Sequence, residues 1–372
     1  MMLKPTWRSF PLALVLILAA CGSAAAPSTP PPSSPAPASA APAKPAASAS
    51  AKPAASAGAS TAAKPAASAA ASPAASGLTP VNVAITAIAT TTIPTWVAEA
   101  KGFFKEQGLD AKVSYIAGST SVIPALINGD VQIAETQAAA SVQAQLKGQD
   151  TVSLATHAPY ADLRFISQQN IMKMEDLKGK TVAVTKAGTV SDTVGRAVLP
   201  KFGLTPDKDV RIVYVDTQPG QLAALQNKSV DAMLTPPPFD LIAEKAGFRE
   251  LFSVRTLNFP YPTDGVVTTR KYLKEHPDVV VKYLKAFEEA VHFAPANPDE
   301  TKKILSAQTK ETDPEILDAA YKAQMNDWAD PPTPTIEGIQ TILQLYGGEG
   351  KNPSDFIDPA PLAQAVKELG IK

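Results

Sequence analysis

The stretch DLKGKTVAVTKAGTVSDT, from Asp176 to Thr193, joins a short apolar run to a small polar loop and then to a helical pattern. Thr181–Thr185 is almost wholly apolar, which is typical of a strand buried on both faces of a parallel sheet. Gly188 then permits a tight turn, and Thr189 or Ser191 stands where a helix N-cap is expected. These residues predict a strand, a loop and a helix start of an α/β protein.

A strand, a polar loop and a helix start together place several unpaired backbone N–H groups around one point. Such a point favours an anion or another hydrogen-bond acceptor. We therefore predict that the Gly188–Ser191 corner holds the most electronegative group of a ligand, an ordinary strand-to-helix turn being the alternative. Lys186 lies beside the loop and could supply charge, unless it is a solvated surface lysine. The loop lacks GxGxxG and the P-loop pattern, so a nucleotide is not indicated.

The first 21 residues read as a targeting segment. Lys4 and Arg8 precede an apolar run, Leu12–Ala20, that is too short to span a bilayer. The run ends in Leu-Ala-Ala-Cys, and Cys21 is the only cysteine of the 372 residues. This resembles a bacterial lipobox, which implies a lipid anchor on Cys21 and a place on the outer face of the cytoplasmic membrane. A secretory signal with a chance cysteine is the alternative. Lipidation leaves no thiol for disulfides, metal binding or catalysis.

Residues 22–77 consist almost entirely of Ala, Pro and Ser, and AKPAAS recurs from Ala43, Ala51 and Ala63. Such a segment has almost no bulky side chains whose burial could offset its ordering entropy. We predict a disordered tether that is dispensable for ligand binding. The remaining residues carry 29 basic and 35 acidic side chains, a net charge of −6, without a basic run. Nucleic acid is therefore not expected as a partner.

After Pro80 short strands and helices alternate, which indicates mainly parallel sheets with helices on both sides. The predicted strands are 81–87, 111–117, 131–134, 152–157, 181–185, 211–215 and 230–234. After Thr263 the pattern becomes almost entirely helical, and a block without strands must cover the sheet of another unit. We predict that residues 78–162 and 265–372 form lobe I and that residues 163–264 form lobe II. The chain would cross near Leu163 and return near Asp264.

Five segments resemble the two-lobed periplasmic substrate-binding proteins of ABC importers, in the branch that serves sulfonates, nitrate, taurine and thiamine-pyrimidine precursors. They are AEAKGFFKEQGLDAKV (98–113), ALINGDVQIA (125–134), DLKGKTVAV (176–184), LAALQNKSVDAML (222–234) and YLKEHPDVVVKYLKAFEEA (272–290). The resemblance implies the type II periplasmic-binding-protein fold, with two crossover segments as a hinge and closure on a small polar or anionic ligand. It also implies a monomer that delivers its ligand to an ABC permease. A ligand-sensing module for a membrane receptor is the alternative.

Ligands of open parallel sheets sit beyond the carboxyl ends of the strands. The candidates at these ends, besides the 186–191 loop, are Thr91, Thr92, Trp96, Thr136, Gln137, Pro237 and Asp264. Each has a structural alternative: Trp96 in the core, Thr136 and Gln137 as helix caps, Pro237 as a rigid connection, and Asp264 as a turn cap before Gly265. Arg164 falls in the first crossover and could pair with an acidic residue across the hinge.

Catalysis, cofactors and metal ions are not expected. One distant relative of the resembled family makes the thiamine pyrimidine with histidine, iron and a cysteine-rich segment, and no such segment exists here. The three histidines, His157, His276 and His292, show no metal-ligand spacing. No nucleophile elbow or Ser-x-x-Lys signature is present. A pyrimidine-precursor synthase therefore remains only as a remote alternative to a binding protein.

Overall fold

The computed structural model describes residues 77–371. The predicted signal peptide, the lipidated Cys21 and most of the predicted tether lie outside these residues. Among the described residues, no helix combines the length and the apolar character needed to cross a membrane.

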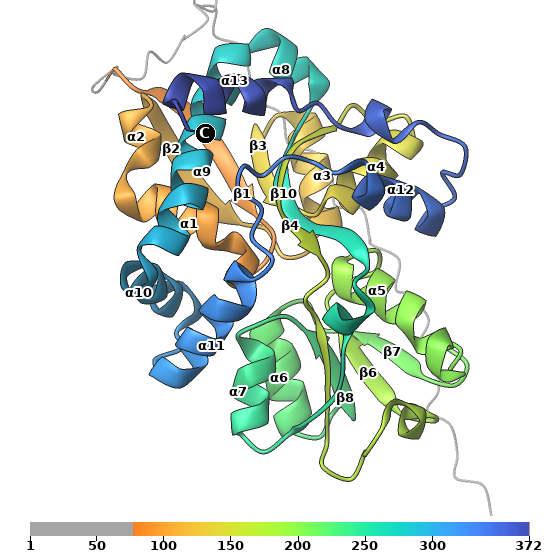
Figure 1. Ribbon diagram of the computed structural model, residues 1–372. Coiled ribbons are helices and arrows are strands. Elements are labelled where there is room, and N and C mark those ends of the chain that lie inside the picture. Colours follow the sequence, from red (N-terminus) through yellow and green to blue (C-terminus); the bar gives the residue numbers. More distant parts are fainter. Residues whose placement is uncertain (1–76, 372) are drawn as a thin grey trace, which may run out of the picture. The chain divides into compact units, whose positions relative to one another are not determined.

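The first sheet has the strand order β2-β1-β3-β10-β4 (Figure 1). Its strands are β1 (Thr79–Ile85), β2 (Leu109–Tyr115), β3 (Ile133–Thr136), β4 (Val152–Tyr160) and β10 (Pro260–Thr268). β1 pairs in parallel with β2 and β3, whereas β10 runs antiparallel to both β3 and β4. Four strands therefore share one direction, and the strand that returns from the second sheet opposes them.

The second sheet repeats this arrangement in the order β7-β6-β8-β5-β9. Its strands are β5 (Arg164–Ser167), β6 (Thr181–Val184), β7 (Arg211–Tyr214), β8 (Ala232–Thr235) and β9 (Arg249–Ser253). β6 is parallel to β7 and β8, and β5 is antiparallel to β8 and β9. Again the crossover strand is the one that opposes the others.

Helices cover both faces of the first sheet because its strands alternate their side chains between two cores. Val81, Val83 and Ile85 face a core shared with α1, α2, α9 and α13, whereas Ala84 faces α3 and α4. The helices of the first half are α1 (Ile93–Lys101), α2 (Phe103–Glu106), α3 (Ser119–Asn128) and α4 (Ala138–Leu146). Gly102, with φ of 82°, separates α1 from α2, whereas the apolar spacing of residues 94–107 predicts one continuous helix.

In the second sheet α5 covers one face, and α6 and α7 cover the other. Their bounds are α5 (Val190–Val198), α6 (Gln218–Gln226) and α7 (Phe239–Lys245). Val182 and Val184 of β6 face α5, and Ala183 faces the other core. The apolar run of the sequence is thus buried on both faces, as predicted.

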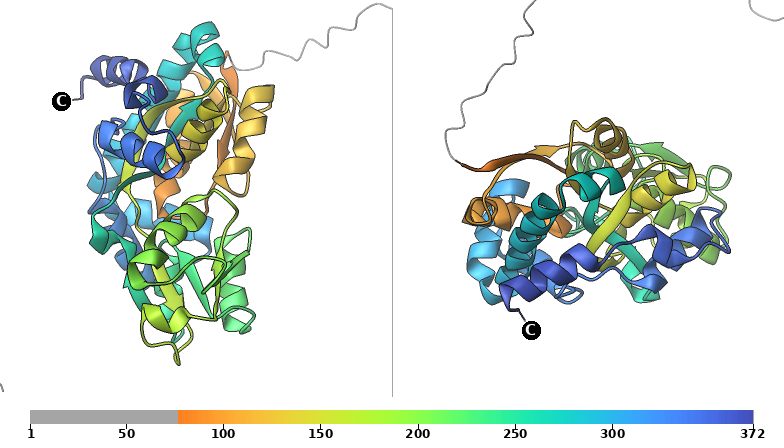
Figure 2. Two further views of the ribbon diagram at one scale, coloured as in Figure 1. Left: turned by 90° about the vertical axis from the view of Figure 1, so that its right-hand side faces the viewer. Right: turned by 90° about the horizontal axis from the view of Figure 1, so that it is seen from above.

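The C-terminal helices return to the first lobe, where α10 packs against α1 and α13 packs against α9 (Figure 2). They are α8 (Arg270–Glu275), α9 (Pro277–Ala296), α10 (Pro298–Thr309), α11 (Pro314–Met325), α12 (Ile336–Leu345) and α13 (Ala360–Leu369). α12 lies against α4 and β10. The final helices therefore cover a sheet that was largely built before residue 160.

The chain passes between the sheets twice, between β4 and β5 and between β9 and β10. β5, β9 and β10 are absent from the sequence prediction. The chain turns helical about five residues later than expected, because β10 continues to Thr268 and places Asp264 inside the first sheet. The Pro and Gly residues of β10 hide it from pattern analysis, although pairing with β3 and β4 stabilises it as a strand.

Candidate functional site

A cavity lies where the carboxyl ends of the strands of both sheets meet. Its empty space is about 640 Å³, including the part that is open to solvent. Its lining comprises Thr86, Ala87, Ala89, Thr91, Gly118, Ser119, Gln137, Asp162, Leu163, Thr185, Thr189, Val190, Ser191, Gln218, Gln221, Leu234, Pro236, Thr263 and Asp264. Residues directly after β1, β3, β6 and β8 contribute, which is the expected ligand position for open α/β sheets.

Two carboxyl groups line the cavity, Asp264 from β10 and Asp162 from the crossover between β4 and β5. Asp264 on β10 is only 3% exposed, and its Oδ1 accepts a hydrogen bond of 3.0 Å from the Gly265 N–H. Burial raises the pKa of Asp264 to about 7, against hydrogen bonds from Thr91 and Gly265 that lower it. Asp162 follows β4; burial also raises its pKa, while Arg164 acts in the opposite direction. The lining is thus acidic on the hinge side.

Glu135 on β3 is a third buried carboxyl, 1% exposed and next to Asp264. Neither of its oxygens has a hydrogen-bond partner among the described residues. Its pKa is raised well above the usual range by burial and by the charge of Asp264. His157 Nε2 lies 3.9 Å from Glu135, but burial lowers the His157 pKa to about 4, so the imidazole is neutral at pH 7. That nitrogen lies 2.6 Å from the Thr91 carbonyl, to which it donates its proton.

We expect Glu135→Gln to stabilise the protein at pH 8 and to change little at pH 5. A carboxyl whose pKa is higher in the folded than in the unfolded state loses stability as pH rises through the folded pKa. Glutamine cannot ionise, so the variant avoids this pH-dependent loss and should gain at least about 1.4 kcal/mol at pH 8, the equivalent of one pKa unit. Thermal melts at both pH values measure this, with the exposed Glu337→Gln as control. Equal shifts at both pH values would argue against an ionising Glu135.

Two amide side chains at the start of α6 present unpaired acceptors. Gln218 and Gln221 line the cavity and are 6% and 0% exposed. Gln221 donates from Nε2 to the Val215 carbonyl over 3.5 Å. The Oε1 atoms of both glutamines are buried and have no partner among the described residues. A ligand that donates hydrogen bonds would satisfy them.

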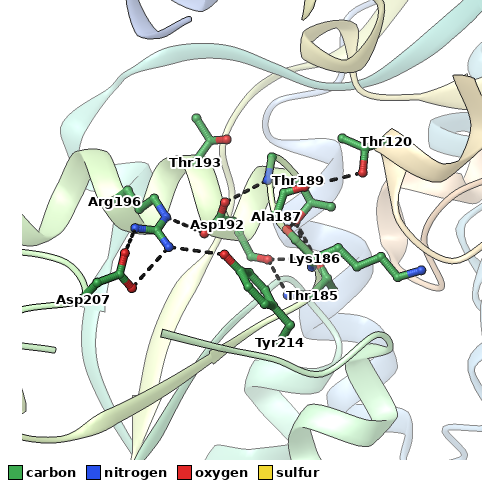
Figure 3. Close-up of polar contacts among 12 residues, drawn as sticks. Thr120, Thr185, Lys186, Ala187, Thr189, Asp192, Thr193, Arg196, Asp207 and Tyr214 are labelled. Carbon is green, nitrogen blue, oxygen red and sulfur yellow. Dashed lines mark hydrogen bonds and ion pairs between the residues drawn. The ribbon is translucent and has the colours of Figure 1, made fainter. Parts of the chain in front are cut away.

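In the loop before α5, some of the backbone N–H groups donate hydrogen bonds to acceptors within the loop and the first turn of α5 (Figure 3). The Gly188 N–H donates to Asp192 Oδ2 over 2.8 Å, and the Thr189 N–H donates to the Lys186 carbonyl over 3.2 Å. Two of the N–H groups of this corner are therefore paired within the loop. The N–H groups of Val190 and Ser191, in the first turn of the helix, have no partner among the described residues.

The Gly188 carbonyl, in the second lobe, accepts hydrogen bonds from side chains of the first lobe. It accepts hydrogen bonds from Gln137 Nε2 at 3.3 Å, Gln143 Nε2 at 3.4 Å and the Tyr346 hydroxyl at 3.5 Å. All three donors come from elements that pack with the first sheet. Gly188 has φ of +74°, so this backbone geometry suits glycine.

A family model described as "NMT1/THI5 like" matches residues 89–301, more than half of the chain. The chain belongs to the NMT1/THI5-like family. It is 30% identical over 226 residues to the taurine-binding periplasmic protein of Escherichia coli, covering 59% of this chain and 68% of that protein. It is 27% identical over 286 residues to the Bacillus subtilis protein YtlA, whose name gives it as a candidate binding protein; the match covers 73% of this chain and 84% of YtlA.

Solved structures agree with this assignment at the level of the fold. The alkanesulfonate-binding protein SsuA of Xanthomonas axonopodis pv. citri superposes with a TM-score of 0.62 at 17% identity, covering 77% of this chain and 97% of that one. The predicted two-lobed periplasmic-binding-protein fold is thereby confirmed. The resemblance to the sulfonate, taurine and nitrate branch is confirmed as well.

In this NMT1/THI5-like chain the cavity brings together some of the predicted site residues. Thr91, Gln137, Thr189, Ser191 and Asp264 line it. Thr92, Trp96, Thr136, Lys186, Gly188 and Pro237 do not. Trp96 is 2% exposed in the core that α1 shares with α9, and Thr136 is wholly buried beside Thr86. Pro236 takes the place in the lining that was expected for Pro237.

The Lys186 side chain extends away from the Asp192–Arg196 pair (Figure 3) and contacts two other residues. Its Nζ lies 3.3 Å from Ser121 Oγ and 3.5 Å from Asp216 Oδ2. The lining residues that sequence analysis did not identify include Ser119, Asp162, Gln218 and Gln221. Asp162 and Gln218 both follow the end of a strand, a signal that could have pointed to them.

Proposed function

We propose that this protein is an extracytoplasmic solute-binding protein that holds a small molecule between its two lobes and delivers it to an ABC importer. The observation that carries the proposal is the cavity, which both lobes line at the carboxyl ends of their strands. The names of the taurine-binding and alkanesulfonate-binding relatives support it. These relatives are named as binding proteins, and we propose binding without catalysis here too.

Neutral contacts around the cavity connect the lobes in a form suited to reversible closure. The Thr90 N–H donates to the Pro237 carbonyl over 3.3 Å, and Thr120 Oγ1 donates to the Ala187 carbonyl over 3.5 Å. A net hydrogen bond contributes only about 0.5–1.5 kcal/mol. Partly exposed ion pairs, Lys245 with Asp313 and Arg255 with Asp327, also join the lobes, and an exposed ion pair contributes only about 0–1 kcal/mol.

The proposal includes the organisation inferred from the sequence. Residues 1–21 would direct export and lipidation at Cys21, and residues 22–77 would tether the binding unit to the membrane. Residues 78–162 and 265–372 would form lobe I, and residues 163–264 lobe II, with the boundary at β10 moved toward Pro260 because this strand belongs to the first sheet. A monomer with an ABC permease as its partner completes the proposal.

Native mass spectrometry of the protein purified without refolding tests binding, and uptake assays after deletion of the gene test transport. We expect one small molecule to be retained and its import to fail in the deletion strain. Retention without any change in import would instead favour a sensing role. A protein that neither retains a small molecule nor responds to a ligand panel in thermal melts would contradict the proposal.

Gly188→Val should weaken binding of the retained molecule by about tenfold or more, equivalent to about 1.4 kcal/mol. A Cβ at Gly188 would lie 3.3 Å from Thr120 Cγ2 and 3.4 Å from Gln143 Oε1, both in the opposite lobe, so the closed form is disfavoured. Gly203→Val is the matched control, because Gly203 has φ of +71° and open space around it. Calorimetry should show loss only in Gly188→Val. Equal losses in both variants would assign the effect to backbone strain.

A further inference from the structure

We propose that the cavity takes a ligand that presents a cationic or hydrogen-bond-donating nitrogen group to Asp264 and Asp162, an amine or amidine-like compound rather than an organic monoanion. This inference rests on the proposed solute-binding function and names its substrate class. An alkanesulfonate, the ligand in the name of one relative, lacks such a nitrogen group, whereas taurine, in the name of another, carries an ammonium group beside its sulfonate.

The charged side chains of the lining are the first support. The lining contains Asp162 and Asp264 and no lysine, arginine or histidine. An anion in the cavity would therefore meet carboxyl groups without a basic side chain in contact to compensate them.

The nearest basic side chains are already engaged outside the cavity. Lys186 contacts Ser121 and Asp216, as described above. Arg164 pairs with the buried Asp240 and with Glu250 at 3.4 Å, and its Nη2 approaches Asp162 only to 3.9 Å. Arg164 is therefore shared among three carboxyl groups, two of which lie outside the lining.

Unpaired acceptors are the second, independent support. The Oε1 atoms of Gln218 and Gln221 are buried in the lining and have no partner among the described residues. Because Gln221 already donates its amide N–H to Val215, its oxygen is left to accept. A ligand with several N–H donors satisfies these oxygens and the carboxyl groups together, whereas a sulfonate offers acceptors only.

The opposite wall has donors that suit a polar but uncharged part of the same ligand. The N–H groups of Val190 and Ser191, which have no partner among the described residues, lie there, whereas the Thr189 hydroxyl already donates to the Lys186 carbonyl over 2.7 Å. The start of α5 already has a negative charge, since Asp192 accepts from the Gly188 N–H and pairs with Arg196 at 2.7 Å. This end of the cavity therefore suits a hydroxyl or carbonyl oxygen of the ligand better than a second anion.

The test uses two matched probes with the full-length protein: 3-aminopropan-1-ol and propane-1-sulfonate. Calorimetry and thermal melts should show that the amino alcohol binds at least tenfold more tightly than propane-1-sulfonate. Equal or tighter binding of the sulfonate overturns this inference and leaves the proposed function intact. If no probe binds and native mass spectrometry finds no retained molecule, the proposed function itself fails. A retained molecule without a nitrogen donor overturns the inference alone.

Asp264→Asn and Asp162→Asn then test the residues. Each variant should bind the amino alcohol at least tenfold more weakly while its affinity for the sulfonate stays the same or rises. The exposed Asp130→Asn, far from the lining, should change neither affinity. Parallel weakening of both probes would indicate a general loss of the cavity and contradict the proposed charge selection. Far-ultraviolet circular dichroism verifies that each variant is folded.

Discussion

Replacing Gly265 with alanine should leave little folded protein, because β10 and β4 approach each other at this residue as closely as their backbones permit. A Cβ at Gly265 would lie 2.0 Å from the Ala155 carbonyl oxygen, 2.9 Å from its carbon and 3.0 Å from the Thr156 Cα. All three are backbone atoms in the interior of the first sheet, so no side chain can rotate away. We expect a loss of more than about 3 kcal/mol, beyond the usual range for overpacking.

Urea denaturation and the yield of soluble protein measure this effect. Gly129→Ala is the control, since Gly129 has φ of +81° but nothing within 4 Å of the added Cβ. It should cost about 1–2 kcal/mol through backbone strain alone. A Gly265→Ala protein as stable as this control would mean that β10 does not run beside β4 in the register seen here, which would also move Asp264 away from the cavity.

Arg164→Met should destabilise the second lobe by about 3–5 kcal/mol at pH 8, since removing one partner of a buried ion pair leaves an uncompensated charge. Asp240, whose side chain is wholly buried, hydrogen-bonds to the Arg164 guanidinium. Burial raises the pKa of Asp240 to about 7 even though Arg164 lowers it. Without the arginine the pKa must rise further.

The pH dependence of this variant has a definite sign. A carboxyl whose pKa is raised in the folded state destabilises the protein least when it is protonated. The loss in the free energy of unfolding therefore grows as pH rises from about 4, the pKa of aspartate in the unfolded state, through the pKa in the folded state. The deficit of Arg164→Met should therefore be smaller at pH 5 than at pH 8. The double variant Arg164→Met with Asp240→Leu should recover most of it. Denaturation at both pH values measures these differences, and a deficit that does not vary with pH contradicts the assignment to Asp240.

Arg164 contacts Asp162, at the crossover between the lobes, only at 3.9 Å, and its closer ion pairs lie elsewhere. Its partners Asp240 and Glu250 belong to α7 and β9, within the second lobe, because β5 is itself a strand of the second sheet. The sequence pattern does not predict β5, the strand that positions this arginine. Only the pairing of β5 with β8 and β9 directs the side chain toward Asp240.

Local patterns in the sequence were sufficient for the α/β class and for most of the alternating strands and helices. Those features depend on the apolar spacing of neighbouring residues, such as Val182 and Val184 on one face of β6 and Ala183 on the other. Such spacing is a property of a few consecutive residues, and it is visible before any tertiary contact forms.

Tertiary structure alone decided the acidic side of the cavity and the role of Gly188. Glu135 and Asp264 are more than a hundred residues apart and become neighbours only because β10 inserts beside β3. The Gly188 carbonyl finds Gln137 and Tyr346 only when the lobes meet. Charge repulsion, burial and hydrogen bonding act between neighbours in space. Their effect on which ligand binds can therefore be inferred only once the order of the strands in the sheets is known.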